Sequence, residues 1–261
     1  MRERADELLV ERGLAPSLEK ARAMLMAGLV SSGGERVTKA GTLLSPDKAL
    51  DIKATQPFVS RAGPKLAQAL DAFGIDPAGK VAADIGASTG GFTDCLLGRG
   101  ARLVYAVDVD TKQLDWKLRG DPRVVMIEKN ARSLIRGDFP RAPKIVSMDV
   151  SFISVLKILP ALKAVLAPGG VLVVLVKPQF EAPPSKVGKG GIVRDPAVRA
   201  EVLERVVLGA ADSGFVLGGL VRCSTRGRTG NVEFLARFSR HGAGPGREAL
   251  AALIREVVAD E

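Results

Sequence analysis

The sequence is poor in the residues that build metal sites, disulfide scaffolds and membrane spans. It has two cysteines and one histidine among 261 residues, too few for a disulfide-stapled fold, and no Cys/His cluster has metal-ligand spacing. Its longest strongly apolar run, Val171–Val176, is far shorter than the roughly 20 residues that span a bilayer. The first residues carry mixed charge and no apolar stretch, unlike a secretory signal. We therefore expect a soluble, cytoplasmic protein with no metal and no membrane insertion.

Positive charge, in contrast, is in excess. Hydrophobic residues make up 46% of the chain and charged residues 26%, which is typical of a folded protein, and the net charge is +9. Residues 1–60 contribute only +1, whereas residues 61–261 contribute +8, concentrated in two glycine-rich stretches, 177–194 and 222–240. Two basic, glycine-rich loops favour a groove that binds a polyanion, although a merely solvated basic surface is the alternative.

The chain divides by pattern into a small unit, 1–55, and a large one, 56–261. In the small unit, two short helices are expected from Ala5 and from the serine cap Ser17, followed by a hairpin over residues 29–39 and short strands near 43–44 and 49–52. Residues 54–57 are expected to form the linker. These features predict a compact α+β domain of about fifty residues.

In the large unit, strands and helices alternate from Pro64 onward. Five strands are expected, of which the first is buried, and they cover 81–85, 103–107, 124–127, 144–148 and 171–176. An antiparallel pair over 215–223 and 232–238 and a last amphipathic helix over 247–259 are expected to follow. A helix is expected over 154–166. This alternation predicts a Rossmann-like, doubly wound, mostly parallel α/β sheet with an antiparallel last strand.

A glycine-rich turn follows the first of these strands, with the sequence Asp84-Ile85-Gly86-Ala87-Ser88-Thr89-Gly90-Gly91-Phe92. The dinucleotide fingerprint G-x-G-x-x-G is not met because Ser88 occupies the second glycine position. The turn resembles the D-x-G-x-x-x-G element of S-adenosylmethionine-dependent methyltransferases. Asp108 ends the second strand, where a carboxylate accepts hydrogen bonds from ribose hydroxyls, and Asn130 follows the third, where an adenine-contacting loop is expected. A turn with purely structural glycines is the alternative.

The residues after the fourth strand bear on the atom that is methylated. They read Asp149-Val150-Ser151-Phe152, without the Asn/Asp-Pro-Pro-aromatic element of amino-nitrogen methyltransferases and without the nucleophilic cysteine of base-carbon enzymes. Cys95 and Cys223 are interpreted as small buried apolar residues, and His241 lies in a glycine-rich segment.

Four charged residues are expected at one edge of the sheet. Asp149 and Lys177 end neighbouring strands, Glu233 lies in the last strand, and Lys65 opens the helix before the first strand. A ribose hydroxyl is nearly un-ionised at neutral pH, so its methylation needs a positioned base or cation. We expect Lys177 to be that group, with Lys65 beside it and Asp149 and Glu233 orienting it. A structural ion-pair network is the alternative.

These four residues look like the K-D-K-E tetrad of FtsJ-like ribose 2′-O-methyltransferases. The first fifty residues resemble an S4 RNA-binding domain, and the combination is similar to the TlyA family over nearly the whole chain. The resemblance implies cytidine 2′-O-methylation of ribosomal RNA, in the small subunit, the large subunit or both. It also implies that the donor is held by Gly86, Ala87, Ser88, Gly90, Phe92, Asp108, Asn130 and Asp149, and that RNA meets Arg2, Arg4, Lys39 and Arg61.

The chain departs from the S4 pattern at two places. Leu18 follows Ser17 where arginine is frequent, and the hairpin reads Val30-Ser31-Ser32-Gly33-Gly34 instead of Val-x-Val-Asn-Gly. Two other functions remain open. One is a membrane-active haemolysin, since the family also carries that label, and the other is a ribosome-associated RNA-binding protein without catalysis. The sequence gives no oligomeric state.

Overall fold

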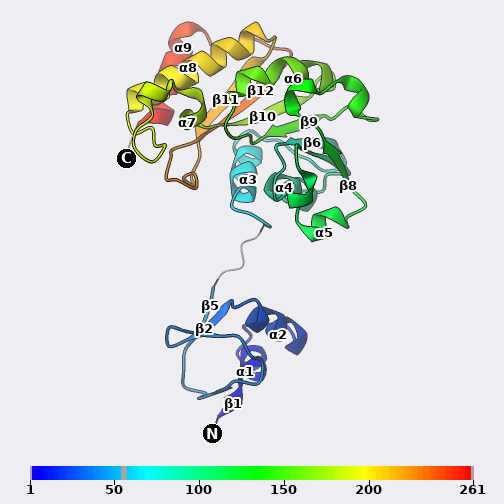
Figure 1. Cartoon of the computed structure of the whole chain (residues 1–261), viewed down its shortest axis with the longest axis vertical. Helices are drawn as coiled ribbons and strands as arrows, with labels where there is room; N and C mark the ends of the chain where they lie inside the picture. Colours follow the sequence, from blue (N-terminus) through cyan, green and yellow to red (C-terminus); the bar gives the residue numbers. More distant parts are fainter. Residues whose placement is uncertain (1, 54–57, 260–261) are drawn as a thin grey trace. The chain divides into compact units, whose positions relative to one another are not determined.

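The structure, a computed structural model, describes residues 2–53 and 58–259. It contains two compact units, residues 1–56 and residues 57–261, and each is described by itself (Figure 1). The predicted linker, 54–57, and the boundary between 55 and 56 lie outside the described residues, so the division of the chain at that point stays a prediction.

The amino-terminal unit combines two helices with short strands. Its elements are β1 (Glu3–Arg4), α1 (Ala5–Glu11), α2 (Leu18–Met26), β2 (Val30–Ser32), β3 (Glu35–Val37), β4 (Leu43–Leu44) and β5 (Leu50–Ile52). The Ser17 hydroxyl accepts a hydrogen bond from the Lys20 amide and so caps α2, as predicted. β2 pairs with β3 and β5, whereas β4 pairs with β1, a two-residue strand too short to show a sequence pattern.

A buried carboxylate joins the start of this unit to its second helix. Asp6 is fully buried, and its oxygens accept hydrogen bonds from Arg4 Nε at 3.0 Å and from Arg22 Nε at 2.9 Å. The Arg4 hydrogen bond is the main cause that lowers the pKa of Asp6 to about 2, and Arg22 adds to it. The predicted RNA-contacting residue Arg4 is therefore also a structural residue.

The second unit is an α/β sheet covered by helices. Its strands are β6 (Val81–Ile85), β7 (Leu103–Asp108), β8 (Val124–Glu128), β9 (Ile145–Met148), β10 (Val171–Val176), β11 (Val216–Arg222) and β12 (Phe234–Ser239). Its helices are α3 (Gly63–Ala72), α4 (Gly91–Gly98), α5 (Trp116–Arg119), α6 (Leu159–Val165), α7 (Pro178–Glu181), α8 (Pro196–Asp212) and α9 (Arg247–Val258). Short 3₁₀ turns are η1 (Thr111–Gln113), η2 (Ala131–Ser133), η3 (Arg136–Asp138), η4 (Val155–Lys157) and η5 (Pro184–Lys186).

The seven strands lie in the order β11-β12-β10-β9-β6-β7-β8, and only β12 runs against its neighbours. The predicted fold class is therefore confirmed. The helix expected over 154–166 is instead η4 followed by α6, because Pro160 lacks an amide hydrogen and fits the first turn of a new helix. The order reverses between β6 and β9, which both lie in the middle of the sheet and pair in parallel.

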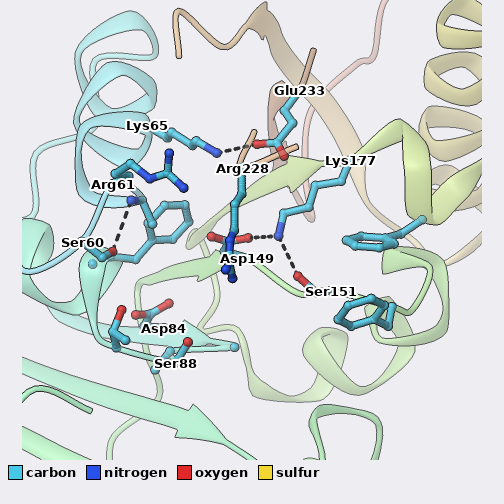
Figure 2. Close-up of a pocket in the computed structure, with 18 of the residues that line it drawn as sticks. Ser60, Arg61, Lys65, Asp84, Ser88, Asp149, Ser151, Lys177, Arg228 and Glu233 are labelled. Atoms are coloured by element: carbon cyan, nitrogen blue, oxygen red, sulfur yellow. Dashed lines mark hydrogen bonds and ion pairs between the residues drawn. The ribbon is translucent and has the colours of Figure 1, made fainter. Parts of the chain in front are cut away.

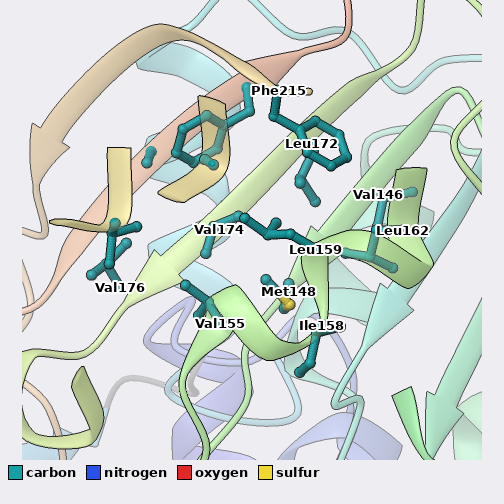
Figure 3. Packing of buried hydrophobic residues seen from close by; sticks show 14 of the residues in the cluster. Val146, Met148, Val155, Ile158, Leu159, Leu162, Leu172, Val174, Val176 and Phe215 are labelled. Carbon is teal, nitrogen blue, oxygen red and sulfur yellow. The ribbon is translucent and has the colours of Figure 1, made fainter. Parts of the chain in front are cut away.

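The central strands β6, β9 and β10 are buried on both faces of the sheet, since side chains that point to opposite faces are alike buried. The edge strand β8 is more exposed, with Val125 and Met126 at the surface. In β10, Leu172, Val174 and Val176 pack in one hydrophobic cluster with α6, α8 and α9, which Figure 3 shows in part. Val173 and Leu175 belong to the opposite cluster with α3 and α4. No helix in the described residues is long and apolar enough to cross a membrane.

The Asp6 cluster generates a stability prediction. Asp6→Asn removes a buried charge-assisted acceptor, so we expect the unfolding free energy of the amino-terminal unit to fall by about 2 kcal/mol at pH 7. Since the pKa of about 2 in the folded chain lies below the usual value near 3.9, the stabilisation is complete above about pH 4 and is lost as the pH falls towards 2.

Hydrogen exchange of peptides from α1 and α2, followed by mass spectrometry of the full chain, measures this effect at pH 7. The exposed Asp47, changed to Asn, is the matched control. Equal protection in the two variants would contradict the role assigned to Asp6.

Candidate functional site

A concave site of the second unit lies where the strand order reverses. It is a pocket of about 540 Å³ at the carboxyl ends of β6, β9 and β10 (Figure 2). Open α/β sheets bind ligands at this position, and the volume is ordinary for a small-molecule site. Its lining includes Ser60, Arg61, Lys65, Asp84, Gly86, Ala87, Ser88, Phe92, Asp149, Ser151, Phe152, Lys177, Gln179, Arg226, Arg228 and Glu233.

The glycine turn forms one wall of the pocket and requires glycine at its first position. Gly86 has φ +82°, and a Cβ there would lie 2.5 Å from the carbonyl oxygen of Asp149. Gly90 also has positive φ, and a Cβ there would lie 2.3 Å from Leu118 Cδ1. The turn can therefore approach both the end of β9 and the core only without side chains at these positions.

Of the predicted donor-binding residues, five line the pocket: Gly86, Ala87, Ser88, Phe92 and Asp149. Asp108 lies next to them, since its Oδ2 accepts a hydrogen bond from the Ser88 amide at 2.8 Å. Gly90 packs against the core residues Leu114 and Leu118. Asn130 caps η2 by accepting a hydrogen bond from the Arg132 amide. Neither Gly90 nor Asn130 is part of the pocket lining.

Asp84 is a buried carboxylate in the pocket that was not predicted as a site residue. Its Oδ2 accepts hydrogen bonds from the amide and hydroxyl of Thr93, at 2.9 and 2.8 Å. Within the described residues its Oδ1 has no hydrogen-bond partner. Burial, and to a smaller extent the negative charge of Asp149, raise the pKa of Asp84 to about 7. A carboxylate inside an apolar strand was the available sequence signal.

The four predicted charged residues meet as two ion pairs (Figure 2). Lys65 Nζ lies 2.5 Å from Glu233 Oε2, and Lys177 Nζ lies 2.6 Å from Asp149 Oδ1. The Lys65 and Glu233 side chains are only 9% and 3% exposed. The expectation that Glu233 orients Lys177 is therefore wrong, because Glu233 pairs with Lys65.

Glu233 also lies one residue before β12 and not inside it. Because β12 is antiparallel to β10, its first residue stands at the same sheet edge as the last residue of β10. The backbone of Gly227 covers the carboxylate, since a Cβ there would lie 2.3 Å from Glu233 Oε1. The pair with Lys65 is thereby shielded from solvent.

Aromatic side chains beside Lys177 were not predicted to contribute. Lys177 Nζ donates a hydrogen bond to Ser151 Oγ at 3.0 Å and lies 5.7 Å from the ring centre of Phe180. Phe152, with φ +64°, is 90% exposed and its ring centre is 4.9 Å from that of Phe180. Such a backbone conformation is strained for a bulky residue and is found most often at functional sites. An exposed ring at the rim can stack on a planar group.

The remaining predicted residues are distributed over both units. Arg61 is exposed and lines the pocket together with Arg226 and Arg228. Arg2 and Lys39 are exposed in the amino-terminal unit. These positions are accessible to a polyanion.

Neither cysteine has the character of a nucleophile. Burial raises the pKa of Cys95 to about 12 and also raises the pKa of Cys223. His241 is exposed, and the described part of the chain holds no group of three or more potential metal ligands. The site's chemistry is therefore that of its paired charges.

Comparison with known proteins gives this arrangement a family context. The S4 domain family matches residues 3–49, and the FtsJ-like methyltransferase family matches residues 58–240. The chain is 43% identical to TlyA of Mycobacterium tuberculosis, a 16S/23S rRNA (cytidine-2′-O)-methyltransferase, over 89% of this chain and 88% of that protein. It is 41% identical to Hemolysin A of Brachyspira hyodysenteriae, over 90% and 99% of the two chains. A solved Streptococcus thermophilus structure, described as a candidate hemolysin, has a TM-score of 0.74 at 42% identity and covers 98% of this chain and 95% of its own.

The contact of Gly86 with Asp149 generates a prediction. Gly86→Ala is expected to destabilise the second unit by more than Gly79→Ala, although both add a methyl group at positive φ. Only the Gly86 variant places that methyl group against backbone, since nothing lies within 4 Å of a Cβ at Gly79.

Thermal unfolding of both variants in otherwise identical chains measures the difference. We expect each to lose about 1–3 kcal/mol from backbone strain, and the Gly86 variant to lose more. Equal melting temperatures would show that the turn does not depend on its contact with Asp149.

Proposed function

Because this chain belongs to the FtsJ-like methyltransferases of the TlyA family, with an S4 domain in its first fifty residues, we propose that it methylates the ribose 2′-oxygen of a cytidine in ribosomal RNA, with S-adenosylmethionine as methyl donor. The observation that carries the proposal is the meeting of the Lys65–Glu233 and Lys177–Asp149 pairs at the mouth of a pocket formed by a glycine turn. The TlyA names of the relatives support ribosomal RNA as the substrate class.

The residues of the pocket fit the methyl donor. Gly86, Ala87 and Ser88 present a turn without bulky side chains, Asp108 stands beside Ser88 for ribose hydroxyls, and Asp84 adds negative charge for the donor's ammonium group. When bound, S-adenosylmethionine supplies a methyl group from its positively charged sulfur. After the transfer, that sulfur is a neutral thioether in the leaving group.

Lys177 is the group that we assign to the acceptor oxygen. Asp149 and Ser151 fix its Nζ at the pocket mouth. In its neutral amine form, Lys177 takes the hydroxyl proton through the lone pair of Nζ as the bond between the 2′-oxygen and the methyl carbon forms and the bond between that carbon and sulfur breaks. Lys65, held by Glu233, stabilises negative charge that develops on the oxygen. Fixing both reactants in line contributes much of the rate.

RNA binding is assigned to exposed cations and to the S4 domain. Arg61, Arg226 and Arg228 surround the pocket, while Arg2 and Lys39 are exposed in the S4 domain. Phe152 is placed to stack on the base attached to the target ribose. An enzyme that modifies ribosomal RNA acts where ribosomes are assembled, which supports the cytoplasm as its location.

The two other functions have less support. Membrane lysis by an amphipathic helix requires a free apolar face, whereas α9 buries Leu250, Ile254 and Val257 in the core cluster that also contains α8. A non-catalytic RNA-binding protein does not require an intact tetrad, whereas all four charged residues are present and paired here.

Methyl transfer to isolated ribosomal subunits tests the proposal directly. The protein is incubated with labelled S-adenosylmethionine and with each subunit, and 2′-O-methyl positions are then mapped. We expect label on a cytidine ribose. Label on a base atom would contradict the ribose assignment, and no label on either subunit or on naked rRNA would favour the non-catalytic function.

A lysine variant tests the assigned catalytic group. Lys177→Ala is expected to bind S-adenosylmethionine with unchanged affinity and to lose methyl transfer by about a hundredfold or more, the range that general acid–base catalysis supplies. Lys80→Ala, at an exposed position before β6, is the matched control and should transfer at the wild-type rate. Activity retained by the Lys177 variant would refute its role.

The raised pKa of Asp84 predicts pH-dependent donor binding. The ammonium group of the donor favours ionised Asp84, and protonation below the pKa of about 7 removes that charge. Affinity measured by isothermal titration should therefore fall by up to about tenfold for each unit below pH 7. Asp84→Asn should bind more weakly at pH 7.5 and show a flatter profile. A wild-type affinity independent of pH between 5.5 and 7.5 would contradict this assignment.

A further inference from the structure

A second cavity, with a volume of about 570 Å³, lies between residues 192–199 and residues 222–232. Four arginines line it, Arg194, Arg199, Arg222 and Arg226, and no acidic side chain of the described residues does. Arg226 also lines the catalytic pocket, so the two cavities meet at this side chain. The established family and the proposed chemistry assign nothing to this second cavity.

The cavity is formed by two loops that a buried amide holds together. Asn231 is fully buried, and its Oδ1 accepts a hydrogen bond from the Val193 amide at 2.9 Å. Its Nδ2 donates to the Gly191 carbonyl at 2.8 Å and to Thr229 Oγ1 at 3.0 Å. The contacts with Val193 and Gly191 connect the loop before α8 with the loop before β12, and the contact with Thr229 lies within the latter loop. The two loops that carry the arginines are therefore connected through both the oxygen and the nitrogen of the Asn231 amide.

Two of the arginines are accessible at the surface of the cavity. Arg194 and Arg226 are exposed, and neither forms an ion pair with a carboxylate in the part of the chain that the structure describes. The Arg194 carbonyl accepts a hydrogen bond from Arg199 at 2.8 Å, and Arg199 is only 2% exposed. The backbone of Arg194 is thus bound by a buried side chain.

We propose that this cavity binds a backbone phosphate of the RNA strand whose target ribose lies in the catalytic pocket. Guanidinium groups bind phosphate through two parallel hydrogen bonds, which makes arginine the preferred residue for such sites. The position of Arg226 on both cavities places the phosphate close to the reacting nucleotide. This proposal rests on the proposed function, because it takes RNA as the source of the phosphate.

The salt dependence of binding measures phosphate contacts. Each contact contributes about 0.7 to 0.9 to the slope of log affinity against log salt concentration. Binding of the full-length protein to purified small and large ribosomal subunits is measured from 50 to 300 mM KCl. For Arg194→Gln we expect about a tenfold loss of affinity at the lowest salt and a slope smaller by about one.

The controls separate this site from general charge. Arg102→Gln removes the same charge at an exposed position before β7, at the opposite sheet edge, and should leave the slope unchanged. Arg194→Lys keeps the positive charge but cannot form two parallel hydrogen bonds to phosphate. It should therefore have the wild-type slope of log affinity against log salt concentration but only part of the wild-type affinity. Affinity for S-adenosylmethionine should be unchanged in all three variants.

The outcomes distinguish the possible sources of phosphate. Equal slopes for Arg194→Gln and Arg102→Gln would overturn the proposal. Inorganic phosphate is titrated as a second probe: if it binds the wild type and not Arg194→Gln, while subunit binding is the same for both, the cavity takes a free anion and the RNA assignment is wrong. If the slope changes as expected but wild-type protein transfers no methyl group, the phosphate site stands and the proposed activity fails.

Discussion

The site depends on one close contact between backbone segments, that of Gly86 with the carbonyl of Asp149. β6 and β9 pair in parallel in the middle of the sheet, and their connections leave in opposite directions from this point. The glycine turn thereby contacts Asp149, one of the four charged residues of the tetrad. Under the proposed function, a donor bound to the turn and an acceptor held at Lys177 share one pocket, because no side chain separates the turn from Asp149.

Much of this arrangement was predictable because it follows from strand order. Asp149 and Lys177 end strands that are consecutive in the sequence and parallel in the sheet, so their meeting needed no knowledge of packing. The pairing of Lys65 with Glu233 was not predictable in the same way. These residues are 168 positions apart, and their contact depends on how α3 packs across the sheet towards β12. The hydrophobic periodicity within each element does not indicate which elements pack against each other, so it could not predict this contact.

Other features of the site leave even less trace in sequence. The left-handed backbone of Phe152 occurs at a bulky residue and not at the glycine or asparagine that would have signalled it in the sequence. Asp84 appeared only as part of a turn motif, whereas its raised pKa results from complete burial. Asn231 belongs to no motif, and its role follows from two contacts with a loop that is distant in the sequence. Sequence patterns therefore fail to predict the roles of residues such as Asp84, which depends on burial, and Asn231, which connects two loops by hydrogen bonds.

The distribution of charge separates binding from chemistry. The tetrad contains two cations and two anions in contact, so its net charge is zero and it exerts little attraction on a distant polyanion. Buried ion pairs gain little stability over apolar side chains, which makes these pairs hard to explain as purely structural features. The excess positive charge of the second unit stands instead on Arg61, Arg226 and Arg228 around the pocket and on the arginine cavity beside it. Under the proposed function, a polyanion is attracted by the rim, while Asp149 and Ser151 hold the Lys177 side chain in place at the centre. Under the proposed function, the excess cations are the groups that bind RNA, and the paired charges are the groups that act on the ribose oxygen.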